Sequence, residues 1–554
     1  MIRCVGALLT GMAVTASGAA EPIAAEGDAP LPNLVWLSVE DMSPWLPCYG
    51  DSTVATPNID RLAKSSVRYA NAFATSPVCA PARSSLITGM YATAIGSMHH
   101  RVGSGRARLS SGADVRPKYE AVPPPFVRCF PELLRRAGYY CTNNSKTDYQ
   151  FKAPATVWNE SSPRAHWKNR PAGAPFFAVF NYEGTHESQA FPRAKRRPEV
   201  IAASDVPLPP FYPDTPAVRD GMARTYNNIA AMDAWVGERL EELQESGLLD
   251  NTIVFFFSDH GVGLPRGKRS LYDTGTRVPL LIRIPDSDRA GETDTRVVSF
   301  IDFAPTVLSL ARIEPDQRLN GVPFLGPFER PGTGLAFAHA DRFDEVYDRA
   351  RSVTNGRYRY VRNYDVDMPY LLRNAYRENL PMTADLYALA EGGAERPAQW
   401  QIAAQTRVAE ELYDSASDPW EVRNLADDAD HQAMLADLRS KLDQWIEQTG
   451  DLGLITPESK MIRERLWNGA DAQPTTSPPR CEYRNGRLAV SCEMEGASLG
   501  YRNTGDKAWQ VYDGPVKADP GQRLQVLAHR IGFKPVRTEY RVPSAQRRQP
   551  VSSD

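Results

Sequence analysis

The sequence predicts an α/β fold in which one sheet carries a functional site at the carboxyl ends of its strands. Two features of the 554 residues predict this fold class. Short apolar runs of strand length alternate along the chain with segments of helical periodicity. Clusters of polar residues follow directly after several of these apolar runs, which is where α/β sheets place their sites.

The first expected strand is the apolar run Asn33–Val39, which is followed by Glu40 and Asp41. Further strands are expected at 139–142, 176–180 and 252–257, and the last of these ends before Asp259 and His260. Helices are expected at 57–66, 81–88, 130–137 and 226–245. Pro81 suits the first turn of its helix, and Gly89 is a helix stop signal.

The second half of the chain is expected to hold two smaller parts. Residues 341–470 are less regular, with an aromatic strand at 358–364 and a helix at 431–449, and form a subdomain of the main domain at 21–340. A linker rich in Pro, Thr and Ser follows at 471–480. Residues 481–545 are expected to form a small β-sandwich. In it, Asn485-Gly486 predicts a hairpin that sets Cys481 opposite Val490, and a diagonal Cys481–Cys492 bridge stays open.

The first twenty residues are typical of a secretory signal. Arg3 is followed by an apolar stretch and then by the small residues Ser17 to Ala20. The stretch is too short for a membrane anchor, and no later stretch is long enough to span a bilayer. We therefore expect an exported protein, periplasmic or extracellular, without a transmembrane segment. A net charge of −3 without a basic block argues against nucleic-acid binding.

The seven cysteines indicate that one thiol is kept for chemistry. Cys4 leaves with the signal, and the other six are too sparse for a disulfide scaffold and lack the paired spacing of a zinc site. Cys79 stands in the segment Cys79-Ala80-Pro81-Ala82-Arg83, which continues to Thr88-Gly89. On this segment alone, a structural thiol before a capped helix is the alternative interpretation.

This segment resembles the sulfatase signature C-x-P-x-R followed by T-G. The resemblance runs from about residue 33 to 425 and ends in the L-Y-D, D-P and N-L pattern at 412–425. It implies an alkaline-phosphatase-like sandwich with a mixed central sheet, followed by the smaller C-terminal subdomain and the appended β-sandwich. It also implies that a formylglycine-generating maturation enzyme converts Cys79 to 3-oxoalanine (formylglycine).

The resemblance assigns the covalent chemistry to position 79. One hydroxyl of the hydrated aldehyde attacks sulfur, and the other loses its proton and expels sulfate as the aldehyde re-forms. The helix that begins near Pro81 directs free N–H groups at that anion. Arg83 is expected to hold a formylglycine hydroxyl.

The resemblance further implies a divalent cation bound by Glu40, Asp41, Asp259 and His260 together with residue 79. Oxygen ligands favour Ca²⁺, and Mg²⁺ is the alternative. The family pattern has Asp-Asp where this chain has Glu40-Asp41, and His260 is a softer ligand than the Asn of other members. The alternative for the acids is that they cap loops.

Three further residues match catalytic positions of the family. Lys146 and Lys268 are implied to contact the sulfate oxygens, and His186 to protonate the leaving group. Asp148 stands where the family has a histidine, so this chain departs from the family at the base that the resemblance would assign there. Surface lysines and a loop histidine are the alternatives.

His100 and Arg101 are expected to line the pocket and contact the sugar. The motifs are most similar to N-sulfoglucosamine sulfohydrolases and their bacterial relatives, which implies hydrolysis of a sulfate ester or sulfamate on a glycan. Two alternatives stay open: a phosphonate monoester or phosphodiester hydrolase of the same superfamily, and a catalytically silent glycan-binding protein. Which sugar and which sulfate position are used also stays open.

Overall fold

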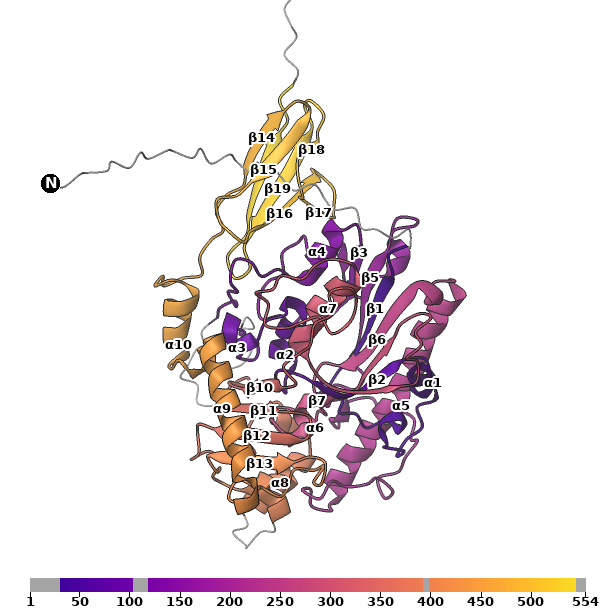
Figure 1. Cartoon of the computed structure of the whole chain (residues 1–554), viewed down its shortest axis with the longest axis vertical. Helices are drawn as coiled ribbons and strands as arrows, with labels where there is room; N and C mark the ends of the chain where they lie inside the picture. Colours follow the sequence, from indigo (N-terminus) through magenta and orange to yellow (C-terminus); the bar gives the residue numbers. More distant parts are fainter. Residues whose placement is uncertain (1–29, 103–117, 392–397, 545–554) are drawn as a thin grey trace, which may run out of the picture. The chain divides into compact units, whose positions relative to one another are not determined.

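A nine-stranded mixed sheet forms the centre of the computed structural model, which describes residues 30–102, 118–391 and 398–544 (Figure 1). The expected signal segment, residues 1–20, lies outside the described residues. Strands β4, β3, β5, β1 and β6 are parallel, whereas β8 is antiparallel to β6 and β2. This confirms the mixed central sheet. In spatial order the strands are β4 (Glu160–Ser161), β3 (Tyr140–Asn144), β5 (Phe176–Tyr182), β1 (Asn33–Val39), β6 (Thr252–Ser258), β8 (Leu280–Arg283), β2 (Val67–Phe73) and β7 (Arg277–Val278), with β9 (Thr293–Ser299) beside β2.

Side chains of the central strands alternate between two helical layers. Val35 and Leu37 of β1 belong to a core that includes Met232 of the long helix α5. Trp36 points to the opposite face. There its ring centroid lies 5.3 Å from the ring centroid of Phe130 in α4 and 5.9 Å from the ring centroid of Phe303 in α7. Because both faces are covered, the strands are apolar on both sides. The helices are α1 (Pro57–Lys64), α2 (Cys79–Thr88), α3 (Ala92–Ile95), α4 (Phe130–Arg136), α5 (Pro216–Glu245), α6 (Asp273–Thr276), α7 (Phe303–Leu310), α8 (Met382–Glu391), α9 (Gln432–Thr449) and α10 (Glu458–Met461).

Two predicted helix starts are wrong. Helix α2 begins at Cys79, two residues before the expected start, because Val78 is extended and its carbonyl already accepts a hydrogen bond from the N–H of Ala82. Helix α5 begins at Pro216, ten residues early. The Thr215 side chain accepts a hydrogen bond from the N–H of Val218, so Thr215 is an N-cap followed by proline at the first helical position.

A second, antiparallel sheet follows in the order β10 (Ala336–Ala340), β11 (Ala350–Thr354), β12 (Tyr358–Asn363) and β13 (Glu410–Asp414). Helix α9, orange in Figure 1, packs on it through Leu438, Leu442 and Trp445, which share a core with Val353 and Tyr360. The helix predicted at 431–449 and the strand predicted at 358–364 thus form, each within one residue of its expected bounds.

The C-terminal strands form a small sandwich of two antiparallel sheets, which confirms that part of the predicted fold. One sheet contains β14 (Arg480–Arg484), β15 (Arg487–Ser491) and β18 (Val516–Lys517); the other contains β17 (Gln510–Val511), β16 (Ser498–Asn503), β19 (Arg523–His529) and β20 (Val536–Arg541). Cys481 faces Val490 as predicted, and both Cys481 and Cys492 are free thiols. Among the described residues, no helix is long and apolar enough to cross a membrane.

Candidate active site

The polar residues after β1 and β6 meet because the two strands are parallel neighbours. Val39 is paired in register with Ser258, so Glu40 and Asp41 leave the sheet beside Asp259. The N–H of Asp41 donates a hydrogen bond to Oδ1 of Asp259 at 3.1 Å. All three carboxylates are buried, with at most 1% of each residue exposed. Three buried acids and the imidazole of His260 therefore lie at one sheet edge, as the sequence predicts.

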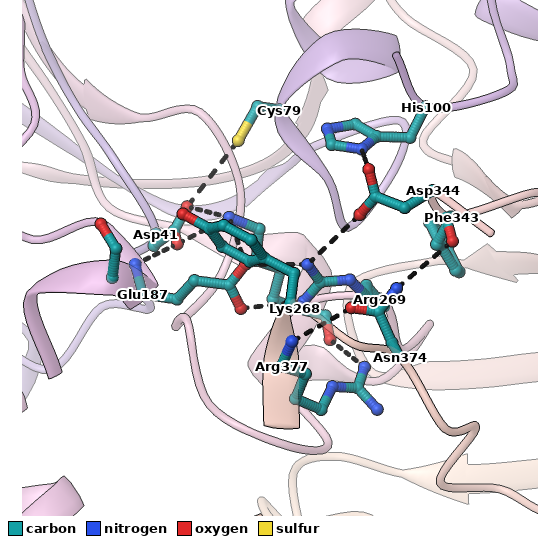
Figure 2. A network of polar contacts seen from close by, with 12 residues as sticks. Asp41, Cys79, His100, Glu187, Lys268, Arg269, Phe343, Asp344, Asn374 and Arg377 are labelled. Carbon is teal, nitrogen blue, oxygen red and sulfur yellow. Dashed lines mark hydrogen bonds and ion pairs between the residues drawn. The ribbon is translucent and has the colours of Figure 1, made fainter. Parts of the chain in front are cut away.

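The first residue of α2 brings a nucleophilic position to these carboxylates. Sγ of Cys79 lies 3.2 Å from Nε2 of His260. It also lies 3.9 Å from Oδ1 of Asp41 (Figure 2). One turn along α2, Nε of Arg83 donates to Oδ2 of Asp259 at 3.0 Å. Its NH1 donates to Oδ1 of Asn181 at 2.8 Å. The helix start thus aims Cys79 into the cluster, and Arg83 ties the helix to the ends of β5 and β6.

Three basic side chains surround Cys79. Nζ of Lys146 lies 2.7 Å from Oε2 of Glu40. Nζ of Lys268 lies 2.8 and 3.0 Å from the two carboxylate oxygens of Asp41 and 3.3 Å from Nε2 of His186. The structure therefore brings Lys146, His186 and Lys268 into the same cluster, although they lie on three separate loops.

The cations control the ionisation of the buried groups. Burial alone would raise the pKa of the Cys79 thiol, but Lys146 and Lys268 hold that pKa well below its ordinary value. Burial is likewise outweighed at Asp41, where Lys268 keeps the pKa of the carboxyl far below its usual range. Burial raises the pKa of Glu40 to about 7 although Lys146 acts against it. The surroundings of position 79 therefore favour an anion.

The donor atoms at this edge fit a hard divalent cation. Carboxylates of Glu40, Asp41 and Asp259 supply oxygen ligands of the kind that Ca²⁺ and Mg²⁺ prefer. Oε1 of Glu40 is buried, has no hydrogen-bond partner among the described residues, and lies 4.0 Å from NH2 of Arg83. Nδ1 of His260 lies 2.9 Å from the carbonyl oxygen of Gly261, so Nδ1 carries a proton and Nε2 is directed at the cluster, 3.0 Å from Oδ1 of Asp41. Gly263 is required here, since a Cβ would lie 2.8 Å from Oδ2 of Asp41.

His100 and Arg101 lie beside this cluster on the Cys79 side. His100 is buried, its Nδ1 lies 3.3 Å from Oδ1 of Asp344, and its Nε2 faces Cys79, whose pKa it helps to lower (Figure 2). The guanidinium of Arg101 lies 5.7 Å from the ring centroid of Tyr376. Although burial opposes it, Asp344 and Asp148 raise the pKa of Arg101. Asp148, which replaces the family histidine, is therefore close enough to act on Arg101.

Four residues of the site were not singled out by the sequence. Asn181 holds Arg83, and the N–H of Glu187 donates to Oδ2 of Asp41 at 2.7 Å. The Glu187 carboxylate makes two hydrogen bonds of 2.8 Å to Arg269, whose NH2 lies 3.9 Å from Asp344. Glu187 directly follows His186 and Arg269 directly follows Lys268, so their places in the sequence could have marked them as site residues. Asp344 lies between β10 and β11, and no local pattern marks it.

Comparison with known proteins decides the family. The sulfatase family model matches residues 32–313, and the model of the C-terminal region of N-sulphoglucosamine sulphohydrolase matches residues 265–368. An ulvan-active sulfatase from Formosa agariphila is 43% identical over 543 residues, covering 91% of this chain and 90% of the relative. The chain belongs to the sulfatase family. Human N-sulphoglucosamine sulphohydrolase is 28% identical over 470 residues, with 76% of this chain and 90% of that enzyme covered.

Solved structures share the fold of this sulfatase. One is a protein in complex with its substrate D-glucosamine-2-N,6-O-disulfate, with a TM-score of 0.53 and 17% identity over 78% of this chain and all of that one. Another is a phosphonate monoester hydrolase of Agrobacterium radiobacter, with a TM-score of 0.53 and 19% identity over 76% of this chain and 97% of the other. At these identities the likeness establishes the architecture, and the family assignment establishes a sulfatase.

Proposed function

We propose that this sulfatase removes sulfate from a glycan through formylglycine at position 79, with Ca²⁺ held by Glu40, Asp41, Asp259 and His260. The observation that carries the proposal is the position of Cys79. Its Sγ lies at the N-terminus of α2, 3.2 Å from His260 and 3.9 Å from Asp41, with Lys146 and Lys268 close enough to depress its pKa. Oxidation of Cys79 would supply a hydrated aldehyde as nucleophile, and a bound cation would supply a Lewis acid for the sulfate oxygens.

Lys146 and Lys268 are proposed to hold the sulfate group. The two ammonium groups lie on different carboxylates of the cluster, Lys146 on Glu40 and Lys268 on Asp41. A tetrahedral anion beside residue 79 would face donors from both sides, and α2 adds the positive end of its dipole. Arg83, bound to Asp259 and Asn181, is proposed to orient residue 79 from within the helix.

His186 is proposed as the general acid for the leaving group. Its Nδ1 lies 2.9 Å from Oγ of Ser188, and its Nε2 lies 3.3 Å from Nζ of Lys268, inside the cluster. Burial and Lys268 oppose protonation, but Asp41 raises the pKa of His186 above its ordinary value. A protonated imidazole at this place can deliver a proton to a departing sugar oxygen or nitrogen.

The role of His186 has a test that separates it from a structural one. A sugar leaving group needs protonation, whereas nitrophenolate leaves without it. His186→Ala should therefore lower kcat on a sulfated sugar by about a hundredfold or more, and that on nitrophenyl sulfate far less. Equal losses on both substrates would remove His186 from this role.

The substrate is proposed to be a sulfated glycan, which His100 and Arg101 would contact. The 43% identity to an ulvan-active sulfatase favours ulvan over the N-sulfated glucosamine that the sequence motifs suggested. Sulfate release from ulvan oligosaccharides and from N-sulfoglucosamine, measured side by side, decides between them. Faster cleavage of an aryl phosphate diester than of either sulfated sugar would instead favour the phosphonate or phosphodiester hydrolase.

Maturation tests the proposal as a whole. Mass spectrometry of the peptide that contains position 79 should show an aldehyde in active protein, produced by a formylglycine-generating enzyme. Cys79→Ala should abolish turnover, and chelation should remove activity that Ca²⁺ restores. Full activity of Cys79→Ala would refute the mechanism. Export is proposed from the first twenty residues, and N-terminal sequencing of secreted protein should find them absent.

A further inference from the structure

One outer face of the C-terminal sandwich carries four arginines. We call Arg502, Arg523, Arg537 and Arg541 the basic face. They lie on β16, β19 and β20, which are adjacent strands of one sheet. The alternate residues Leu524, Val526 and Tyr540 point inward and pack in the sandwich core, so the arginines point outward.

The basic face is not neutralised within the described part of the chain. None of its four guanidinium groups has a carboxylate oxygen within 4.0 Å among the residues that the structure describes. Arg523 is paired in register with Arg541, and like charges directly opposite on neighbouring strands destabilise a sheet. The only acid on these rows is Glu539, opposite Gln525. The electrostatic cost of this arrangement suggests that an anion outside the chain offsets it.

The other sheet of the sandwich provides the contrast. Its exposed arginines have partners: Arg480 forms an ion pair with Glu493, Arg484 lies 3.2 Å from Glu482, and NH1 of Arg487 donates to the Pro515 carbonyl. Between Arg480 and Arg541 the chain has 11 Lys and Arg against seven Asp and Glu, whereas the whole chain has a net charge of −3. Positive charge is thus concentrated in the sandwich. On the basic face it has no carboxylate partner among the described residues, although the guanidinium of Arg502 donates to Oε1 of Gln525.

The geometry of the basic face fits an extended polyanion rather than a single ion. Neighbouring strands lie about 4.8 Å apart and alternate residues of a strand about 7 Å apart, so the guanidinium groups are spread over three strands. Arg502 and Arg537 both lie over the ring of Trp509, at 4.4 and 5.7 Å from its centroid, which limits their freedom. A guanidinium binds sulfate or carboxylate oxygens through two parallel hydrogen bonds.

One arginine of the basic face, Arg537, acts on the same imidazole as Lys152 of the main domain. Burial lowers the pKa of His529, and Lys152 and Arg537 lower it further, so both cations are within electrostatic range of one imidazole. Lys152 is six residues after Lys146. Arg537 of the basic face and Lys152 therefore lie around the same histidine, at the end of β19.

From these observations we propose that the basic face binds a sulfated polysaccharide chain and retains it while the active site removes sulfate groups. The choice of a sulfated polysaccharide rests on the proposed function; the polyanion site itself does not. Because the basic face is not part of the catalytic cluster, it should act on the KM for polymers and leave kcat on small sulfate esters unchanged.

The test compares two triple variants that lose equal charge. The face variant is Arg523→Gln, Arg537→Gln and Arg541→Gln, and the control variant is Arg480→Gln, Arg484→Gln and Arg487→Gln; all six side chains are exposed. Binding to immobilised dextran sulfate is measured at low salt in a Cys79→Ser background. The face variant should bind about tenfold more weakly than the parent, and the control variant within about twofold.

Kinetics of the same triple variants with Cys79 intact separate the basic face from the active site. The face variant should raise the KM on a sulfated polymer about tenfold and leave kcat on nitrophenyl sulfate unchanged. Equal weakening in both variants, or no binding of the parent to dextran sulfate, would overturn the proposal. Binding to single-stranded DNA as tight as to dextran sulfate would overturn the assignment to polysaccharide. Dextran sulfate binding without sulfatase activity would refute the proposed function alone.

Discussion

At the scale of single residues, Glu40 is one of the positions where this chain departs from the family pattern, and its carboxyl has a strongly raised pKa. Its pKa is raised to about 7 by burial, while that of Asp41 is far below its usual range. One carboxylate oxygen of Glu40 contacts Lys146 at 2.7 Å and the other has no hydrogen-bond partner among the described residues. The longer side chain therefore links the proposed cation site to Lys146, which a shorter aspartate would not reach in the same way.

Glu40→Asp should weaken Ca²⁺ binding only moderately, whereas Asp41→Ala should abolish it. The aspartate keeps an oxygen ligand but draws it away from Lys146, so affinity should fall about tenfold, as for a disturbed ligand environment. Calorimetric titration of chelator-treated protein with Ca²⁺ measures the Ca²⁺ affinity of both variants. If Asp41→Ala binds Ca²⁺ as the parent does, the cation is held elsewhere.

Asp344 should matter for turnover because it fixes the ring of His100. The contact of 3.3 Å sets which nitrogen of His100 carries a proton and directs Nε2 at position 79. Asp344→Asn removes the charge at equal size, and kcat/KM should fall about tenfold, the value of one hydrogen bond to a charged group. Glu345→Gln, at the next position, is the matched control and should change it less than twofold.

A double-mutant cycle separates this role from general damage to the loop. If Asp344 acts through His100, adding Asp344→Asn to His100→Gln should cost little more than His100→Gln alone. Additive losses, or an equal loss in Glu345→Gln, would show that Asp344 does not act through His100.

At the scale of elements, the sequence predicts the parts that depend on local patterns. Asn33–Val39 and the strand before Asp259 were found because buried parallel strands are continuous apolar runs. The first ten residues of α5 were missed because the Thr215-Pro216 start signal precedes the region of clear apolar spacing. Glu187 and Asp344 were missed because their roles depend on contacts with distant parts of the chain. Glu187 contacts Asp41, which is 146 positions away, and Asp344 contacts His100, which is 244 positions away.

His529, at the end of β19, should make the stability of the sandwich depend on pH. Burial lowers the pKa of His529 from 6.5 to about 4, so the imidazole is neutral in the folded protein at neutral pH. The unfolded chain binds the proton more readily, so His529 costs no stability above pH 6.5 and reduces the free energy of unfolding as pH falls from 6.5 towards 4. The full effect is on the order of 3 kcal/mol.

Urea unfolding of the parent and of His529→Leu at pH 7 and near pH 4.5 isolates this contribution. The variant should lose less stability between the two pH values than the parent does. His431→Gln, a change at a partly exposed histidine before α9, should follow the parent. Identical pH dependence in the parent and His529→Leu would contradict the neutral state of His529.

At the scale of the whole molecule, the C-terminal sandwich is joined to the main sheet region by specific contacts rather than by a linker alone. Oγ of Ser498 donates to the buried carboxylate of Glu132 at 2.6 Å, and NH2 of Arg530 donates to the Pro123 carbonyl at 2.6 Å. Gly500 approaches Thr156 so closely that a Cβ would lie 2.8 Å from it. Sequence composition predicted the linker, but such contacts depend on three-dimensional pairing that no local pattern records.

Removal of residues 473–554 should therefore reduce both stability and activity. Glu132 would lose its Ser498 partner, and the 118–158 segment would lose its support. That segment reaches the residue before His100. The N–H of Ala121 donates to the backbone carbonyl of Gln150, and the Gln150 side chain donates to the backbone carbonyl of His99. We expect a lower thermal midpoint, faster hydrogen exchange in 118–158 and a lower kcat on nitrophenyl sulfate, which does not need the basic face.

Ser498→Ala, which removes one contact, should lower the free energy of unfolding by about 1–3 kcal/mol and keep most activity. A truncated protein with unchanged thermal midpoint and kcat would show that the sandwich is only tethered, and that residues 118–158 hold Lys146 in place without it.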